Sequence, residues 1–516
     1  MTIATAQTIV SNSGNGEGRA HRTLFWMILI VAAVLRFIAA LPESMHHTDE
    51  IGQYTDQAFR LVFGYSAVPW EYRFGMRSWL LPLLLSGPMA LGHWIAPSTS
   101  LYLLLPKLCV GAASLSIPCS AYYLGRRLSP THALIAMAVS GIWFESIFFG
   151  THILSEPLAV AAILPAIAIL SHPQASQKHL VIAGALLGIG LVLRFQYGPA
   201  IAILTIGYCW QSLRLRCLPV IFGGLLAAMA SALIDMMMGA TPFSWLMINI
   251  YQNIIVNRSA QYGVSPPAAY LGEMGAWWGV GMVLIAGLMV SSIQHHRTLI
   301  WAAIINVGLH SAIGHKEYRF IVLSITIFVI VAAISSVTFM QWLKPRLPAN
   351  IARGLPMLLI ATWAGLSASL AFSRDMSLRW TAYGAAQRSM HNVGKDASVC
   401  AVGIDAQLYW EYGSYGLLKR NIPIYPIHPK PERDGMYQLP GKGYAGYNIF
   451  IGNQAFRSRL PRSYIMSDCQ LLMPKNRTLG DANQDIRICV FRRSGGCDGR
   501  GLEKFRINEI LRASGN

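Results

Sequence analysis

Charged residues are scarce in this sequence. Only 12% of its 516 residues are Asp, Glu, Lys or Arg, whereas a soluble domain usually carries about 25%. Hydrophobic residues make up 54% and the mean hydropathy is +0.43, which excludes an ordinary soluble protein and indicates an integral membrane protein. A secretory signal peptide is also missing, because residues 1–23 are mostly polar and no small-residue cleavage site follows the apolar run 24–41. We therefore expect a cytoplasmic N-terminal tail, residues 1–23, followed by a spanning helix.

Several familiar binding motifs are absent as well. The sequence has no Cys-x-x-Cys pair, no glycine-rich phosphate loop and no internal repeat. Nucleic-acid binding is disfavoured because no basic and aromatic surface domain stands out. The net charge of +18 has two interpretations: Lys and Arg of cytoplasmic loops, or an anionic substrate such as a lipid phosphate.

Apolar runs recur as far as residue 372 and predict a transmembrane module over residues 24–372 with about 11–13 spans. The runs lie near 24–41, 102–125, 131–148, 156–171, 180–194, 197–210, 218–236, 277–293, 299–313, 319–340 and 353–372. Basic clusters alternate sides correctly if these runs cross and the run 79–95, with Pro82, Gly87 and Pro88, forms a broken, in-plane or re-entrant helix. Alternatively, that run crosses and one shorter run does not. The first arrangement places the segments 42–78, 149–155, 237–276 and 314–318 on the outer face, together with the tail after 372.

The chain changes character in residues 373–516. Short β-rich runs at 398–404, 447–451 and 486–491 alternate with helical or loop stretches, and five prolines punctuate residues 423–440. This pattern predicts a small soluble α/β domain, which the span count places in the periplasm. The domain contains an even number of cysteines, which permits disulfides outside the cytosol. They are Cys400, Cys469, Cys489 and Cys497.

The outer segment from Met45 to Ser78 concentrates charge between two apolar runs. It contains four carboxylates, three arginines and a histidine pair: Asp49, Glu50, Asp56, Glu71, Arg60, Arg73, Arg77, His46 and His47. Charges beside a bilayer are costly, so their density indicates a site. Because neighbouring side chains diverge on a helix or a strand, we expect one of Asp49 and Glu50 to do the chemistry and the other to organise the site. The alternative is a solvated helix start capped by Thr48 or Asp49.

A second polar cluster, His315-Lys316-Glu317-Tyr318-Arg319, falls on the outer face and breaks the positive-inside pattern. We interpret it as an anion site rather than an accident of the loop. Other outer segments are polar too, although snorkelling or internal pairing would explain each one singly. They include Thr151-His152, Ser155-Glu156, Arg194, Asp235 and the amide-rich stretch 249–259. Together these segments predict a convergence of polar groups at the outer membrane face.

Two histidine pairs, His46-His47 and His295-His296, raise the alternative of a metal site. Adjacent histidines do not share a helix face, and neither pair has the i, i+4 spacing that two ligands on one helix need. We therefore expect no metal and no other cofactor.

Several of these segments match known motifs. His47-Thr48-Asp49-Glu50 follows the first span, Trp70-Glu71-Tyr72 precedes Arg77-Ser78, and His-Lys-Glu-Tyr-Arg-Phe occupies 315–320. With looser matches at 152–156, 194–199 and 249–263, they resemble the mannosyltransferases that build glycosylphosphatidylinositol anchors and dolichol-linked oligosaccharides. One departure is Thr48, where the family usually has proline. The resemblance covers about residues 24–340, and the chain is identified as a bacterial member.

The resemblance implies an α-helical polytopic membrane protein of the GT-C fold, a polyprenyl-phosphate-linked sugar donor, usually of mannose, inverting transfer and no metal. Asp49 is then the leading catalytic base, with Glu50 as the alternative, since a single displacement uses one base. Cations expected to neutralise the donor phosphate are Lys316, Arg319 and Arg77. The remaining residues expected to bind substrate are His47, Glu71, Arg194 and His315.

Residues and resemblance together predict a glycosyltransferase that moves a sugar from the lipid phosphate to a lipid-linked or envelope glycan. We expect it to act at the outer face of a bacterial inner membrane. One alternative is a transporter or flippase of a lipid-linked glycan, which should show ionisable groups near the bilayer midplane and paired repeat halves. Another is a ligase or polymerase of envelope glycans.

Overall fold

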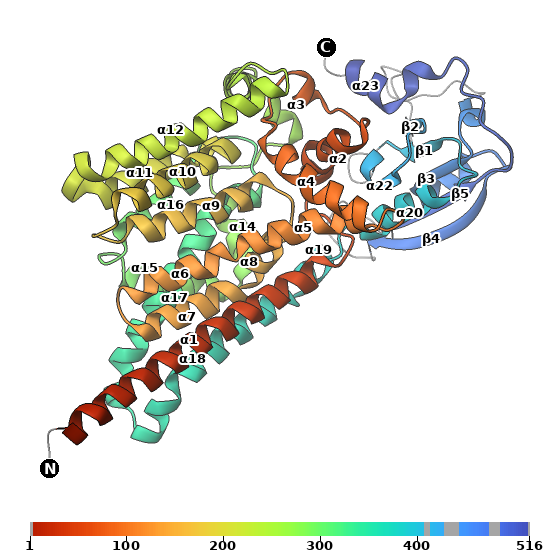
Figure 1. Ribbon diagram of the computed structural model, residues 1–516. Coiled ribbons are helices and arrows are strands. Elements are labelled where there is room, and N and C mark those ends of the chain that lie inside the picture. The colour runs from red at the N-terminus through yellow and green to blue at the C-terminus, as the bar shows by residue number, and fades with distance from the viewer. Residues whose placement is uncertain (1–3, 407–412, 428–442, 474–485, 514–516) are drawn as a thin grey trace.

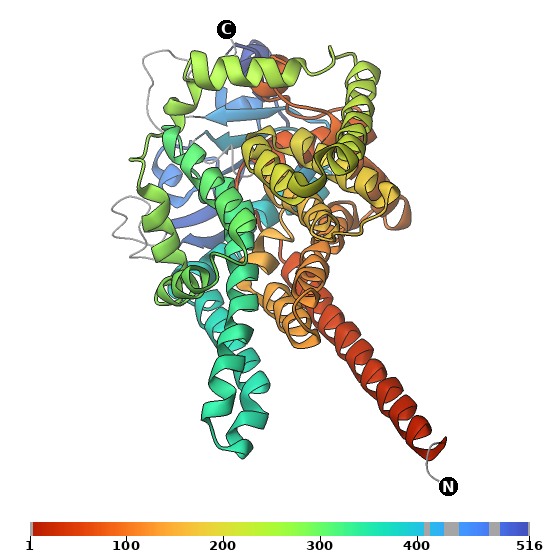
Figure 2. The same cartoon turned by 90° about the vertical axis from the view of Figure 1, so that its left-hand side faces the viewer.

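The computed structural model describes residues 4–406, 413–427, 443–473 and 486–513. A bundle of helices forms one side of the molecule and a small domain with a β-sheet forms the other (Figure 1). Helix α1 runs along the edge of the bundle, and its N-terminal end projects away from the rest of the molecule (Figure 2). The two chain termini therefore lie at opposite ends of the protein.

The helical part comprises α1 to α18, with short π and 3₁₀ turns between some of them. The bounds are α1 Ala4–Ala40, α2 Asp56–Phe63, α3 Trp70–Arg73, α4 Leu80–Ile95, α5 Leu101–Ser114, α6 Ser116–Arg126, α7 Pro130–Ile142, α8 Phe144–Phe149, α9 Ser155–Leu170, α10 Gln177–Leu193, α11 Gly198–Cys209, α12 Leu213–Met237, α13 Ser244–Ile250, α14 Ala269–Trp278, α15 Gly281–Ser291, α16 Arg297–Ala312, α17 Val322–Leu343 and α18 Ala349–Ala371.

Within the described residues, five helical stretches are long and apolar enough to cross a membrane, or six if the bent pair α14 and α15 counts as one span. They are Arg19–Ala40, Leu101–Arg126, Phe195–Met237, Tyr318–Arg346 and Ala349–Ala371. Four shorter apolar helices, α4, α7, α9 and α10, accompany them. Helix α4 runs unbroken through Pro88, so the broken form of the helix predicted for this run is wrong, while the in-plane, re-entrant and crossing forms stay predictions. With so many apolar helices, the chain is an integral, multi-pass membrane protein.

Helix α17 lies at the centre of the bundle. In the most apolar stretch of this helical segment, 94% of the residues are buried. The helix packs against α7, α9, α15, α16 and α18. Its residues are apolar on nearly every side, as expected for a helix surrounded by others. The 3₁₀ turn η6 (Tyr318–Ile321) leads directly into α17. The polar cluster 315–319, whose last two residues begin this turn, is therefore attached directly to the deeply buried α17.

Helices α10 and α12 cross at small residues. A Cβ atom added to Gly184 would lie 1.9 Å from the carbonyl oxygen of Val220, and one added to Gly223 would lie 2.0 Å from that of Val181. No side chain fits at such a distance, so the contact requires glycine. Close backbone approach at small residues is a common way for membrane helices to pack.

The predicted apolar run 131–148 is divided in two. Helix α7 ends at Ile142, Trp143 adopts an extended conformation (φ −62°, ψ 127°), and α8 begins at Phe144. The break places Glu145 inside the bundle, where it is 2% exposed.

The C-terminal part contains the α/β domain that the sequence predicts. Its sheet has the strand order β2-β1-β3-β5-β4, parallel among β2, β1 and β3 and antiparallel for β5 against β3 and β4. The strands are β1 Val402–Asp405, β2 Ile424–Ile427, β3 Ile449–Asn453, β4 Ile465–Met473 and β5 Ile486–Arg492, and the helices are α19 Arg374–Arg379, α20 Gly384–Lys395, α22 Tyr415–Leu418 and α23 Ile507–Ala513. The cysteines form the disulfides Cys400–Cys497 and Cys469–Cys489. Three of the predicted punctuating prolines, Pro429, Pro431 and Pro440, lie outside the described residues.

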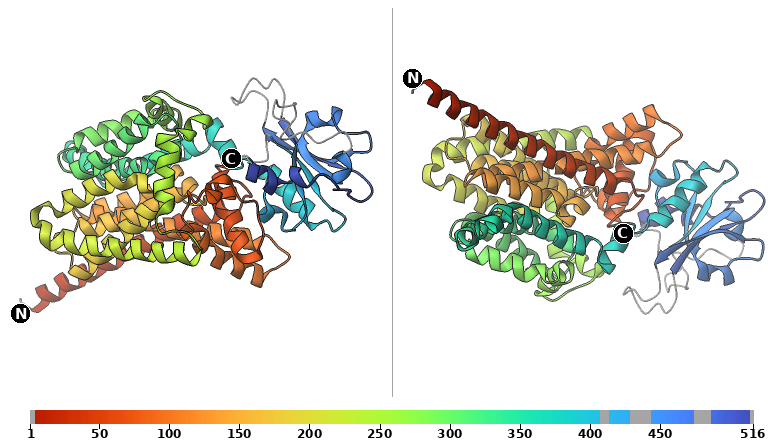
Figure 3. Two further views of the ribbon diagram at one scale, coloured as in Figure 1. Left: turned by 90° about the horizontal axis from the view of Figure 1, so that it is seen from above. Right: turned by 90° about the horizontal axis from the view of Figure 1, so that it is seen from below.

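One hydrophobic cluster joins the C-terminal domain to the loop between α1 and α4. Tyr54 and Phe59 of the loop belong to the same buried cluster as Ile404 of β1 and Ile449 of β3. The loop segments around α2 and α4 accordingly lie between the helical bundle and the sheet (Figure 3). The charged segment 45–78 is thus packed on both sides.

Candidate functional site

Glu50 shapes the charged loop from within. It begins the π-helix η1 (Glu50–Thr55), which continues into α2. Its Oε1 accepts the backbone N–H groups of His46 (2.5 Å) and His47 (3.2 Å), and its Oε2 accepts that of Ile153 (3.0 Å). Glu50 is 4% exposed and does not line the large cavity described below. The Glu50 carboxylate thus holds the backbone of residues 46–47 and of Ile153 together.

The neighbouring Asp49 instead meets the loop before α17. Its Oδ2 lies 2.6 Å from Nη2 of Arg319, 270 positions away in the sequence. The same guanidinium donates from Nε to Oε2 of Glu317 at 2.6 Å, and its Nη1 lies 3.8 Å from Oε1 of Glu156 in α9. A single arginine therefore connects carboxylates from three separate parts of the chain.

Two histidines extend this network. His47 lies 3.4 Å from Asp49 through Nδ1 and 3.3 Å from Glu317 through Nε2. His315 lies 2.9 Å from the other oxygen of Glu317. The two polar clusters singled out in the sequence are therefore one interconnected group in space.

Arg194, at the end of α10, approaches the network from the membrane helices. Its Nη1 lies 3.2 Å from Oε1 of Glu156, and its guanidinium stacks over the ring of Phe320 at 4.4 Å. Since Glu156 also faces Arg319, this buried carboxylate is shared by two cations.

Gln53 and the Trp-Glu-Tyr segment form the opposite side of the site. The side-chain amide of Gln53 donates to Asp49 Oδ1 (2.9 Å) and to Glu71 Oε1 (3.0 Å). The hydroxyl of Tyr72 donates to the carbonyl of Gln53 at 2.8 Å. Arg77 lies beside these groups, and its Nε is buried without a hydrogen-bond partner among the residues that the structure describes. An unfilled guanidinium donor in a polar cavity is suited to an anion.

The charges determine which groups are ionised. Burial by itself would raise the pKa of Asp49, but Arg319 and His47 outweigh it and hold that pKa well below its ordinary value. The same balance, with Arg319 and His315, lowers the pKa of Glu317. The pKa of Glu71 is raised instead, because burial exceeds the effect of Arg77. Asp49 is therefore an anion at neutral pH.

A cavity of about 890 Å³ opens beside this network, a size common for sites that bind small molecules. Its lining includes all of the predicted site residues except Glu50: His47, Asp49, Glu71, Arg77, Arg194, His315, Lys316 and Arg319. The amides of Asn249 and Asn253 also line it. The predicted convergence of polar segments from distant parts of the sequence is therefore present in the structure.

Lys316 lines the cavity, but its ammonium group is engaged with the backbone. Nζ donates to the carbonyls of Ile313 (2.5 Å) and Ser265 (2.9 Å), and the residue is 8% exposed. In this arrangement the charge lies near the cavity while its hydrogen bonds hold the loop.

Other polar residues of the sequence lie elsewhere or have structural contacts. Asp235 is absent from the cavity lining and accepts hydrogen bonds from Trp245 Nε1 (3.0 Å) and the N–H of Phe243 (3.3 Å). His152 is buried and its Nδ1 contacts the carbonyl of Phe148 at 2.6 Å. Across the described ranges, no group of three or more His, Cys, Asp or Glu residues is arranged to hold a metal ion.

The cavity has one wall that sequence reasoning missed. Glu273 and Trp277 of α14 and Arg379 of α19 line it. The Arg379 guanidinium lies over the Trp277 ring at 4.8 Å, and that ring stacks on Tyr318 with centroids 4.3 Å apart. The available signal was an isolated charged residue, Glu273 in the middle of α14 and Arg379 at the end of α19, but isolated charges of this kind are common at membrane surfaces.

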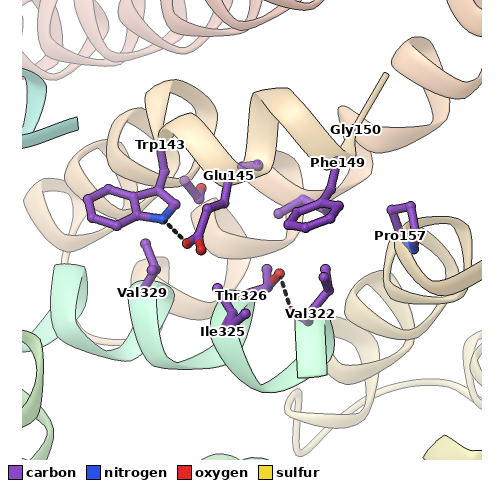
Figure 4. Close-up of a pocket in the computed structure, with 12 residues that line it drawn as sticks. Trp143, Glu145, Phe149, Gly150, Pro157, Val322, Ile325, Thr326 and Val329 are labelled. Atoms are coloured by element: carbon purple, nitrogen blue, oxygen red, sulfur yellow. Dashed lines mark hydrogen bonds between the residues drawn. The ribbon is translucent and has the colours of Figure 1, made fainter. Parts of the chain in front are cut away.

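A much smaller cavity, of about 20 Å³, lies next to Glu145 between α8 and α17 (Figure 4). Oε2 of Glu145 accepts from Trp143 Nε1 and Trp278 Nε1, both at 2.8 Å, and Oε1 accepts from the hydroxyl of Tyr318 at 2.5 Å. Tyr318 stands between Glu317 and Arg319 in the sequence. Glu145 consequently anchors the cluster before α17 from inside the bundle.

Comparison with known proteins gives a consistent result. A family model described as the Alg9-like mannosyltransferase family matches residues 26–409. The GPI mannosyltransferase 3 of Yarrowia lipolytica is 28% identical over 313 residues, 58% of this chain and 60% of the relative. That of Drosophila melanogaster is 25% identical over 336 residues, 60% of this chain and 56% of the relative. The matched part thus spans less than two thirds of the length of these relatives.

Solved structures resemble the chain along nearly its whole length. ArnT from Cupriavidus metallidurans in the apo state has a TM-score of 0.55 and 11% identity, covering 92% of this chain and 98% of that one. The same protein bound to undecaprenyl phosphate has a TM-score of 0.53 and 12% identity, covering 90% and 97%. At such identities the likeness establishes the fold, which is the GT-C membrane fold.

Proposed function

Because the chain belongs to the Alg9-like mannosyltransferase family, we propose that it transfers a sugar, mannose by analogy with that family, from a polyprenyl-phosphate donor to a lipid-linked or envelope glycan. The cations along the cavity support an anionic lipid donor. A protein of the same fold, ArnT, has been solved with undecaprenyl phosphate. From the distribution of basic residues we propose that the reaction takes place at the outer face of the membrane. We take this membrane to be a bacterial inner membrane, with the C-terminal domain in the periplasm.

The contact between Asp49 and Arg319 is the observation that carries this proposal. It puts a carboxylate and a guanidinium side by side on the wall of one cavity. A transferase of this type needs a carboxylate for the acceptor and cations for the departing phosphate. Both are present here within hydrogen-bond distance of each other.

The proposed reaction is a single displacement. The acceptor hydroxyl donates a hydrogen bond to Asp49, and its oxygen attacks the anomeric carbon from the face opposite the phosphate. As the new glycosidic bond forms, Asp49 takes the hydroxyl proton and the bond from the anomeric carbon to the phosphate oxygen breaks. The electron pair leaves with the phosphate, and the configuration is inverted.

Charge sharing resolves an apparent difficulty with Asp49 as a base. The lowered pKa of Asp49 makes it a weak base while Arg319 is paired with it. An arriving donor phosphate competes for Arg319 and thereby raises the basicity of Asp49 when the substrate is in place. Gln53 holds the carboxylate in orientation during this exchange.

The other residues have supporting roles in the proposal. Arg77 offers its unfilled donor to the phosphate, and Lys316 adds a nearby positive charge. Glu71, His47 and His315 orient these groups or bind sugar hydroxyls. Arg194 balances the buried Glu156 behind Arg319, and Glu50 keeps Asp49 in place through the backbone.

The first test is Asp49→Asn in purified protein, with polyprenyl-phosphate mannose and a lipid-linked glycan acceptor. The amide keeps the shape of the side chain but cannot take the proton, so turnover should fall by about 100-fold or more while donor affinity stays within a few fold. Turnover is followed by mass spectrometry of the acceptor. Asp468→Asn, at an exposed position on β4, is the matched control.

Near-normal turnover of Asp49→Asn would eliminate Asp49 as the base. A flippase would instead move a lipid-linked glycan across vesicles without changing it, and a ligase or polymerase would transfer a whole glycan. Mass analysis of envelope glycolipids in a deletion strain would show which sugar and which acceptor are lost.

A further inference from the structure

Asp56 ties the charged loop to the C-terminal domain. It is the first residue of α2, directly after η1, and is 1% exposed. Its Oδ1 accepts hydrogen bonds from the hydroxyl of Ser414 and from the backbone N–H of Gly416 at 2.9 Å, some 360 positions away in the sequence. Tyr102 of α5 donates to the carbonyl of Gly416 at 2.6 Å. The turn 414–416 is therefore held from two sides by the membrane part of the protein.

Asn508 of α23 forms hydrogen bonds with residues 66–68 of the same loop. Its Oδ1 accepts the N–H of Val68 at 3.1 Å, and its Nδ2 donates to the carbonyl of Ser66 at 2.9 Å. Arg73 donates in return to the backbone carbonyl of Asn508 at 2.7 Å. The segment 66–73, which leads into and includes Glu71, is thus fixed by the last helix of the domain.

The C-terminal domain also forms part of the cavity wall. Gly413, next to Ser414, and Leu511, one turn after Asn508, both line the cavity of about 890 Å³. Each lies close to one of the two contacts just described. The domain is therefore part of the site's enclosure as well as a neighbour of its loop.

A short path of contacts leads from these attachments to Asp49. The N–H of Asp56 donates to the carbonyl of Ile51 within η1, and Gln57 donates to the carbonyls of Gly52 and Ala67, both at 2.9 Å. Gln53 of the same π-helix donates to Asp49. Asp56 and Asp49 are therefore linked by hydrogen bonds within one compact turn.

We propose that Asp56 and Asn508 are positioning residues through which the C-terminal domain holds Asp49 and Glu71 in place for transfer. They do not touch the reacting atoms. The catalytic part of this inference rests on the proposed function, whereas the mechanical coupling of domain and loop does not.

Gly416 allows the coupling to be tested from the domain side alone. A Cβ atom at this position would lie 2.8 Å from Asp56 Oδ1, so Gly416→Ala pushes on Asp56 without altering the loop. Asn508→Ala removes both side-chain hydrogen bonds at the second attachment. Gly496→Ala is the control, because a Cβ atom there meets nothing within 4 Å in the same domain.

Two readouts are needed. Hydrogen exchange of residues 45–78 in purified full-length protein should speed up by tenfold or more in Gly416→Ala and Asn508→Ala but not in Gly496→Ala. With polyprenyl-phosphate mannose as the donor, kcat should fall by about tenfold while the donor KM stays within about twofold, because two of the three phosphate cations, Lys316 and Arg319, lie outside the segment 45–78. A protein that had merely lost stability would show faster exchange throughout.

Unchanged exchange of residues 45–78 in both variants would overturn the coupling. Faster exchange with unchanged kcat would overturn the positioning role. If the unmodified protein turns over no polyprenyl-phosphate sugar, the proposed function fails, and the exchange measurement alone decides whether the domain holds the loop.

Discussion

At the residue scale, the site combines paired charges with guanidinium donors that have no hydrogen-bond partner among the described residues. Arg319 and Arg194 each form an ion pair with a carboxylate, whereas Arg77 forms no ion pair within the part of the chain that the structure describes. The buried Nε of Arg77, like that of Arg194, has no hydrogen-bond partner there. Leaving a charged donor unpaired in a buried place is costly, by about 1–3 kcal/mol or more. A bound anion would remove that cost, so Arg77 is well placed to contribute to donor affinity.

Replacing Arg77 with Gln should weaken donor binding. We expect the donor KM to rise by about tenfold or more, since hydrogen bonds to charged groups contribute roughly 1.5–3 kcal/mol. Arg77→Lys should restore part of this because it keeps the charge but not the planar fork. Steady-state kinetics with varied donor concentration measures the donor KM of each variant. Arg60→Gln, an exposed arginine of the same loop, serves as control, and an unchanged KM in Arg77→Gln would remove Arg77 from the phosphate site.

Asp56 should make stability depend on pH. Burial raises its pKa to about 6 from 3.8, and the hydrogen bonds from Ser414 and Gly416 only partly offset this. Because the folded pKa is the higher one, the protonated form stabilises the fold fully below pH 3.8, and this contribution is lost as pH rises through about 6. Two pKa units correspond to about 3 kcal/mol.

The matching variant is Asp56→Asn, which cannot ionise. The melting temperature of the unmodified protein relative to Asp56→Asn should fall between about pH 4 and about pH 7. Thermal unfolding of both proteins across this range measures the difference. A difference that stays constant with pH would show that Asp56 does not titrate in the folded protein.

At the scale of elements, the loop before α17 is positioned by a side chain of another helix. The break at Trp143 places Glu145 in the bundle, where it accepts from Tyr318. Tyr318 lies between the two residues that contact His47 and Asp49, namely Glu317 and Arg319. A helix interruption in one part of the membrane module thus determines the geometry of a loop about 170 positions later.

Tyr318→Phe should therefore impair the site without disturbing the bundle. It removes one hydrogen bond to a buried carboxylate, which costs about 1–3 kcal/mol, and we expect turnover to fall by about tenfold or more. Thermal unfolding and kinetics together separate loss of stability from loss of positioning. Tyr123→Phe, exposed on α6, is the control. Full activity in Tyr318→Phe would show that the loop keeps its geometry without Glu145.

At the scale of the whole molecule, the C-terminal domain is stapled by two disulfides. Cys400–Cys497 closes 97 positions of sequence, and a native disulfide typically contributes about 2–4 kcal/mol to stability. Replacing Cys400 and Cys497 with Ser should lower the melting temperature of the domain. Peptide mapping without reduction should recover both pairs. Cys109→Ser, at a free cysteine of α5, should change little, and four free thiols in the domain would contradict the prediction.

Much of the site could be predicted from the sequence, because charged residues are easily recognised among the apolar residues of a membrane protein. Asp49 and Arg319 stand out as charges among apolar residues, and the alternation of basic clusters puts their loops on one side. Among the described strands of the C-terminal domain, β1, β3 and β5 overlap the β-rich runs that the sequence predicts, whereas β2 and β4 were not predicted. The fold class, the membrane-protein class and the mannosyltransferase family were all confirmed by the structure and the comparisons.

The remaining features depend on contacts that no local pattern encodes. Nothing near Asp56 indicates that its partner is Ser414, and nothing near Trp277 indicates that Arg379 covers it. Glu50 and Asp49 are adjacent acidic residues, so only the folded backbone distinguishes the one that clamps the loop from the one that faces the cavity. Such pairings arise when segments are brought together by packing.

The span between Val68 and Asn508, 440 positions apart, has a consequence for synthesis. The charged loop is synthesised long before α23, the helix that binds it. Until α23 has been synthesised, residues 66–68 lack their hydrogen bonds to Asn508. A premature stop between the membrane helices and α23 should therefore yield a protein whose loop lacks this attachment and whose cavity lacks the wall at Leu511.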